Sequence, residues 1–219
     1  MKAALFFPPQ WTPTMPYLAV PALTAFLRGK GVEVQQRDLN VEAYDFLLSG
    51  QQIERALAVL RQDYGPDGNR RPGRFRVPER KAVQWALSEG PLLAGQVEAA
   101  KSVLRSKAFY DGRASRNALL VLAQALSVIS LAFYPASLEF TTFRPAYPED
   151  RSRDLLAGVR DERTNPFLGF FEKHVLPGLE AAAPQLIGIS IPTMAQMLPG
   201  MTLAYLIKRA GLHAHVTVG

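Results

Sequence analysis

The opening of the chain reads as a strand, a helix and a second strand. Lys2–Phe7 is a short apolar run that stops at a proline pair, as a buried strand followed by a loop would do. Apolar residues then recur at helical spacing from Val20 to Lys30, and Val32–Gln35 alternates apolar with polar residues as a strand does. Two strands joined by such a helix pair in parallel through a right-handed crossover. This opening therefore predicts an α/β fold built on a parallel sheet.

The same pattern resumes near the other end of the chain. Leu186–Ile191 is a continuous apolar run rich in β-branched residues, which is typical of a central parallel strand. A helix is predicted over Met197–Arg209 and a fourth strand over His213–Val218. We therefore expect a Rossmann-like parallel sheet. Since the sequence stops at Gly219, we expect this sheet to be truncated before its last strand, with an exposed edge that is prone to self-association.

The stretch between these two ends is mostly helical in pattern. We expect one domain, residues 1–219, in which a core of residues 1–40 and 185–219 carries a large helical insertion at 41–184. A short strand is expected within the insertion at Leu138–Phe143. Apolar residues at three- and four-residue steps predict helices at Glu42–Gln62, Glu79–Ser88, Leu92–Phe109, Ser115–Phe133 and Pro166–Ala183.

Composition excludes several classes of chemistry. The chain has no cysteine, so it can form no disulfide, no thiolate zinc site and no cysteine-ligated iron–sulfur cluster. Hydrophobic residues make up 48% and charged residues 20%, which is ordinary for a globular protein. The apolar stretches look too short or too interrupted to span a bilayer, and the N-terminus lacks the pattern of a secretory signal. We therefore expect a cytoplasmic protein with no membrane partner.

The net charge of +6 is concentrated locally in one basic segment. Glycine and proline interrupt this segment, and Phe75 is the one aromatic residue within it. Two interpretations stay open: a solvated or domain-docking loop, and a patch for an anionic partner. We expect no specific nucleic-acid partner. The cations of the segment are Arg70, Arg71, Arg74, Arg76, Arg80 and Lys81.

Common catalytic and phosphate-binding motifs are missing. The sequence contains neither the Gly-x-Gly-x-x-Gly nor the Gly-x-x-x-x-Gly-Lys-Ser/Thr pattern, and no Gly-x-Ser-x-Gly elbow. His213 and His215 lie two apart on a predicted strand and share a face, but no carboxylate partner is identifiable for a metal. His174 falls in a predicted helix. We therefore predict no catalytic residue and no metal ligand in this chain.

Parallel sheets present their ligand loops at the carboxyl ends of the strands. Those loops are predicted at Pro8–Pro16, at Leu39 and Asn40, at Ser190–Gln196 and at Gly219. They combine apolar side chains with hydroxyls and amides, which are the residue types that line small-molecule sites.

The residues in and around these loops resemble those of a known protein family. Phe7-Pro8-Pro9-Gln10, the run Pro16–Arg28, Gly31–Val34 and Asp38-Leu39-Asn40 together resemble the opening of cobalamin-binding radical S-adenosylmethionine proteins. Leu186–Ser190, Pro199 and Val216–Gly219 resemble the later strands of the same family. The helical middle is similar to the insertions of members that modify ribosomally made peptides.

The resemblance implies a cobalamin held between this module and a downstream radical S-adenosylmethionine domain. That downstream domain would hold the iron–sulfur cluster and S-adenosylmethionine, commonly for methyl transfer, and a peptide is one substrate that the resemblance suggests. By analogy, Ser190 and Gly219 would face the nucleotide tail and Gln10–Thr14 would lie near the corrin. The cofactor-binding residues are then expected to be Pro9, Gln10, Trp11, Thr12, Thr14, Met15, Asn40, Ser190, Ile191, Thr193, Gln196 and Gly219.

Other interpretations compete with this one. Ser190 would also suit a helix cap and Trp11 a hydrophobic gap. A noncatalytic Rossmann-like scaffold that binds protein and no cofactor is the main alternative, and a nucleotide- or flavin-binding enzyme is a third. Because the Asp-x-His-x-x-Gly signature is absent, we expect no histidine beneath the cobalt. The chain alone is not expected to catalyse radical chemistry.

Overall fold

The computed structural model describes residues 1–65 and 77–219 and divides the chain into two compact units. The sheet unit comprises Met1–Tyr44 and Phe140–Gly219, and the helical unit comprises Asp45–Glu139. Four arginines of the predicted basic segment, Arg70, Arg71, Arg74 and Arg76, lie outside the described residues.

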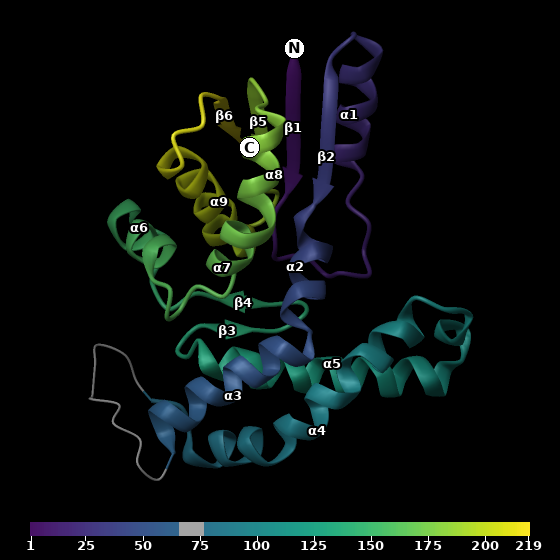
Figure 1. Ribbon diagram of the computed structural model, residues 1–219, viewed down its shortest axis with the longest axis vertical. Helices are drawn as coiled ribbons and strands as arrows, with labels where there is room; N and C mark the ends of the chain where they lie inside the picture. The colour runs from purple at the N-terminus through teal and green to yellow at the C-terminus, as the bar shows by residue number, and fades with distance from the viewer. Residues whose placement is uncertain (66–76) are drawn as a thin grey trace. The chain divides into compact units, whose positions relative to one another are not determined.

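A four-stranded sheet is the centre of the sheet unit as described (Figure 1). Its strands are β1 (Lys2–Phe7), β2 (Glu33–Asp38), β5 (Leu186–Ile189) and β6 (His215–Val218), and they lie in the order β2-β1-β5-β6. Every neighbouring pair runs in parallel. The predicted α/β fold with a Rossmann-like parallel sheet is confirmed.

Helices cover the two faces of this sheet unequally. Leu5 and Phe7 form one core cluster with Val20 of α1 (Ala19–Gly29), because alternate residues of a strand point to the same face. On the opposite face, α9 (Met197–Arg209) comes close to the sheet at Gly200, where an added Cβ would lie 3.6 Å from Ile189 Cγ2. The other elements of this unit are β4 (Phe143–Arg144), α6 (Ser152–Arg160), α7 (Leu168–Phe170), the π-helical turn η2 (Phe171–Val175), α8 (Leu176–Ala182) and the short η3 (Met194–Gln196).

Residues 140–184, which the sequence analysis assigns to the insertion at 41–184, belong to the same compact unit as the sheet, and the helical unit is Asp45–Glu139. The Asn165 amide is 2% exposed and donates to Thr202 Oγ1 of α9 at 2.9 Å. The rings of Phe143 and Phe167 meet edge to face at 5.3 Å. The ring contact is internal to the segment, whereas the Asn165 hydrogen bond joins the segment to α9. Periodicity within a helix does not report such long-range contacts. The helix predicted at Pro166–Ala183 is present as one continuous helical run, in which α7, the π-helical η2 and α8 follow one another without a gap.

Leu39 and Asn40 do not form the predicted loop, because helix α2 (Leu39–Leu47) begins at Leu39. The Asp38 carboxylate accepts hydrogen bonds from the backbone N–H groups of Asn40 and Val41, both at 3.1 Å. This is the action of an N-cap residue, which satisfies the first free N–H groups of a helix. Strand β2 therefore passes directly into a helix.

The helical unit is built from the C-terminal part of α2, α3 (Gly50–Tyr64), α4 (Arg80–Leu104), η1 (Lys107–Tyr110) and α5 (Gly112–Ala132), with β3 (Ser137–Leu138) after them. The helix predicted at Glu42–Gln62 is broken before Ser49, whose hydroxyl caps α3. Conversely, the two helices predicted on either side of Pro91 are one helix, α4. Gly90 packs closely on α3, where an added Cβ would lie 2.5 Å from Leu57 Cδ2.

Helix α5 is long and apolar enough to cross a membrane by length and composition alone. One third of its most apolar window is buried, and it packs against α3 and α4. Packed helices of globular units pass the same test. We therefore interpret α5 as a structural helix of the helical unit.

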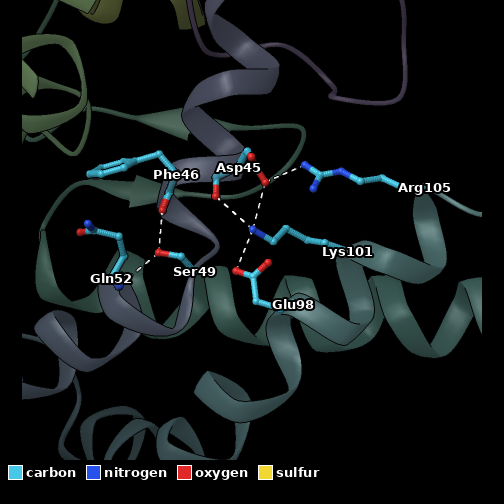
Figure 2. Close-up of polar contacts among 7 residues, drawn as sticks. All are labelled: Asp45, Phe46, Ser49, Gln52, Glu98, Lys101 and Arg105. Carbon is cyan, nitrogen blue, oxygen red and sulfur yellow. Dashed lines mark hydrogen bonds and ion pairs between the residues drawn. The ribbon is translucent and has the colours of Figure 1, made fainter. Parts of the chain in front are cut away.

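An ion-pair network joins α2 to α4 within the helical unit (Figure 2). Lys101 Nζ lies 2.9 Å from both Asp45 Oδ1 and Glu98 Oε1, and Arg105 Nη2 lies 2.6 Å from the same Asp45 oxygen. The Lys101 side chain is 10% exposed, whereas that of Asp45 is 45% exposed. Burial alone would raise the pKa of Asp45, but the two cations together hold that pKa below its ordinary value.

Because of this network, the free energy of unfolding depends on pH. Because the folded pKa of Asp45 is lowered, its contribution is present above the ordinary value of 3.8 and is lost as the pH falls through the folded pKa. We expect Asp45→Asn to lower the free energy of unfolding by about 1 kcal/mol at neutral pH, given the exposure of the carboxylate. Urea unfolding from neutral pH to pH about 3 should show this difference shrinking. Glu98→Gln, a matched change at the more exposed partner, should lower the free energy of unfolding by less. If the difference in stability between Asp45→Asn and the unmodified chain grew in acid, the proposed role of the Asp45 carboxylate would be wrong.

Candidate cofactor-binding site

The sheet has a topological switch point between β1 and β5. These neighbouring strands pair from Ala3 with Leu186 to Phe6 with Ile189, and the chain leaves β1 toward β2 but leaves β5 toward β6. Loops that diverge from adjacent parallel strands open a crevice at the carboxyl edge. The structure therefore brings the predicted loops after β1 and after β5 to the same edge of the sheet (Figure 1).

Three aromatic rings organise the loop after β1. Tyr17 stacks on Phe7 with ring centroids 4.3 Å apart, and Trp11 lies 5.8 Å from Tyr17. The Trp11 indole N–H donates to the carbonyl of Met15 at 3.0 Å. This hydrogen bond folds the loop back on itself. Tyr17 was not among the predicted site residues. An aromatic side chain in a glycine-free loop, just before the predicted first helix, could have indicated it as a site residue.

Buried amides fix the loops to one another. Gln196 is fully buried, and its Nε2 donates to the Pro8 carbonyl at 2.6 Å, which ties the segment after β5 to the loop after β1. Gln10 is 2% exposed and accepts from the Tyr44 hydroxyl at 2.6 Å. The Asn40 side chain accepts from the Trp11 N–H at 3.0 Å. These amide groups hold the loops in position.

A cavity of about 260 Å³ lies beside these loops, on the face of the sheet that α1 covers in part. Ser190 stands at its loop end, with its Oγ 3.4 Å from the Tyr17 hydroxyl. Gly188 forms part of the floor, and a Cβ added there would meet Leu5 Cδ2 at 2.8 Å. A glycine in a strand often marks such a close approach. The cavity is lined by Leu5, Phe6, Ala19, Val20, Leu23, Gly188, Ile189, Ser190, Thr217 and Gly219.

The predicted site residues divide into groups by exposure. Pro9, Gln10, Asn40 and Gln196 are buried, and three of these support the loops through their amides. Ser190 and Gly219 line the cavity. The others form the outer surface of the same loops: Trp11, Thr12, Ile191 and Thr193 are half-buried, whereas Thr14 and Met15 are exposed.

A carboxylate of the chain itself, from Glu149, lies at the N-terminus of α9. Glu149 Oε1 accepts from the Leu198 N–H at 3.1 Å, at the first turn of the helix. Burial raises the pKa of Glu149, and the hydrogen bond from Leu198 opposes that shift. Helix N-termini after the strands of such sheets commonly bind phosphate. Here the carboxylate takes that place, which disfavours a phosphate group at α9.

His213 and His215 lie at the end of the sheet opposite this edge. His174 is exposed in η2, and His215 is the first residue of β6, at the edge of the sheet opposite the ligand loops. His213 precedes β6, so the predicted pair does not share the strand. Within residues 1–65 and 77–219, no group of three histidine, aspartate or glutamate side chains is arranged to hold a metal ion.

Comparisons with known proteins give no match. No protein-family model matches the chain, and neither the curated proteins nor the solved structures contain a significant relative. The candidate site must therefore be interpreted from its own geometry.

Proposed function

We propose that this chain is a cobalamin-binding module of a radical S-adenosylmethionine enzyme, most simply a methyltransferase. The observation that carries the proposal is the cavity beside Ser190 and Gly219, at the switch point of a parallel sheet. Its lining is mainly apolar, with the hydroxyls of Ser190 and Thr217 at its border. Such a lining suits a neutral aromatic ring better than a phosphate.

The residues present fit the two parts of the cofactor. Gly188 and Gly219 let the backbone approach a ring inserted beside α1, because neither carries a side chain. In the loops at the same edge of the sheet, Trp11 and Met15 offer apolar contact area for the corrin, and the Thr12, Thr14 and Thr193 hydroxyls can meet its amide edge. Ile191 packs toward α9 instead, since its Cδ1 would lie 2.4 Å from a Cβ added at Gly200. When bound, cobalamin would supply a transferable methyl group. The residues of this chain bind and orient it and exclude water from one of its faces.

The chain has no cysteine to hold an iron–sulfur cluster, so the cluster and S-adenosylmethionine belong to a downstream domain in this proposal. The acceptor, with a peptide as one candidate, would be chosen largely by that domain. A cytoplasmic location follows as part of the same proposal.

A comparison of two corrinoids tests the proposal directly. We expect the purified chain to retain hydroxocobalamin in equilibrium dialysis, measured by the visible absorbance of the corrin. Cobinamide has the corrin but lacks the nucleotide tail, so it should bind about tenfold or more weakly if the cavity holds the tail, a difference of about 1.4 kcal/mol. Equal binding of both would refute the role of the cavity. Binding of neither would favour the noncatalytic scaffold.

A further inference from the structure

The connection between α4 and α5 ends the helical unit in an exposed tip. Tyr110 is 87% exposed, Phe109 is 41% exposed, and Leu120 on α5 is 57% exposed. Apolar side chains that are exposed together, unlike singly scattered ones, mark interaction sites. We define the basic tip as Lys107, Phe109, Tyr110, Arg113, Arg116 and Leu120.

Hydrogen bonds hold the backbone of the tip in place. The Ser106 hydroxyl accepts from the Ala108 N–H at 3.2 Å and caps η1. Asp111 Oδ1 accepts from the N–H groups of Arg113 and Ala114 at 2.8 and 3.0 Å and caps α5. The tip therefore displays its aromatic rings from a structured turn, with the ring centroids of Phe109 and Tyr110 5.6 Å apart.

The charges of the tip are positive and available. In the ranges 1–65 and 77–219, the side chains of Lys107, Arg113 and Arg116 form no ion pair. Arg113, Arg116 and Leu120 are spaced by three and four residues, so they share one face of α5. The nearest acid in sequence, Asp111, is engaged in the helix cap. Arg113, Arg116 and Leu120 therefore form a cationic and apolar face on α5, and α5 begins directly after the turn that carries Phe109 and Tyr110.

We propose that the basic tip binds peripherally to a lipid surface that carries anionic headgroups, which departs from the sequence-based expectation of no membrane partner. Lys107, Arg113 and Arg116 would meet the headgroup phosphates, while Phe109, Tyr110 and Leu120 enter the interface between headgroups and acyl chains. Aromatic side chains favour this interfacial layer. A nucleic acid or a purely acidic peptide would use the same charges but would leave Leu120 in water. The combination of cations with projecting apolar side chains therefore favours a membrane surface.

Vesicle co-sedimentation of the 219-residue chain tests this proposal. We expect binding to phosphatidylcholine vesicles that contain phosphatidylglycerol, little binding to pure phosphatidylcholine, and loss of binding in about 1 M salt, where the Debye length falls to about 3 Å. The variant R113E/R116E should weaken partitioning by more than about tenfold, because each cation near such a surface contributes a severalfold effect. F109S/Y110S should also weaken it at unchanged net charge.

A matched charge reversal distinguishes the tip from net charge. Arg55 and Arg61 are exposed on α3 of the same unit, so R55E/R61E changes the net charge by the same amount. We expect R55E/R61E to keep most of the binding. Equal losses in the two charge-reversal variants would overturn the proposal, as would failure of the chain to bind anionic vesicles. Binding to an oligonucleotide or to polyglutamate that depends on the tip, without vesicle binding, would overturn it in favour of another polyanion.

Discussion

Ala19→Trp is expected to abolish most cobalamin binding while leaving the fold intact. Ala19 is exposed at the start of α1 and lines the cavity together with Val20 and Leu23. An indole at this position would occupy the space that the proposal assigns to the nucleotide tail. We expect the affinity for cobalamin to fall by about 100-fold, which corresponds to about 2.8 kcal/mol.

The matched control for this substitution is Ala25→Trp. Ala25 is also exposed on α1, but it does not line the cavity. Both variants carry the same modest loss of helix propensity, on the order of 0.5 kcal/mol, so their thermal unfolding should be similar. Equilibrium dialysis should show weak cobalamin binding for Ala19→Trp and unchanged binding for Ala25→Trp. Unchanged affinity in Ala19→Trp would show that the cavity does not receive the tail, and cobinamide should bind both variants alike.

The strands and two helices of the sheet could be predicted from local patterns. The helix over Met197–Arg209 has the bounds that its periodicity predicts, and the four parallel strands are confirmed. The errors occur where one contact outweighs local pattern. Asp38 caps α2 and removes the predicted loop at Leu39, and Pro91 lies inside a continuous helix whose neighbouring Gly90 packs closely on Leu57.

The candidate site was predictable only in part for a similar reason. The predicted parallel direction of the strands was enough to indicate that Ser190 and Gln10 would lie at one edge. The cavity depends on which side of the sheet α1 leaves open and on the absence of a side chain at Gly188, and both are properties of packing. Local sequence patterns also could not show that the amide of Gln196 would be buried against Pro8.

This buried amide leads to the second large expected effect, in Gln196→Leu. Leucine has a similar size but cannot donate to the Pro8 carbonyl, which would lose a 2.6 Å hydrogen bond in a buried position. Leaving a buried carbonyl unpaired costs about 2 kcal/mol, which lowers the melting temperature of a domain of this size by about 6 °C. We also expect weaker cobalamin binding, because the two loops would no longer be tied together. Thr193→Val is the control for thermal stability alone, because the Thr193 hydroxyl meets only the other end of this amide, at 3.4 Å, and is itself assigned to the corrin edge.

Gln196→Glu distinguishes loss of the hydrogen bond from loss of packing. An ionised carboxylate cannot donate to the Pro8 carbonyl, whereas a protonated carboxyl can. Burial raises the pKa of a carboxyl in such a place, so the stabilising contact should be present at low pH and lost as the pH rises through the folded pKa. We therefore expect the stability of Gln196→Glu, measured relative to Gln196→Leu by urea unfolding, to improve between neutral pH and pH about 4. If the difference in stability between the two variants stayed constant with pH, the Gln196 amide would act only by filling space. The coupling of the two loops would then depend on the aromatic cluster at Phe7 and Tyr17.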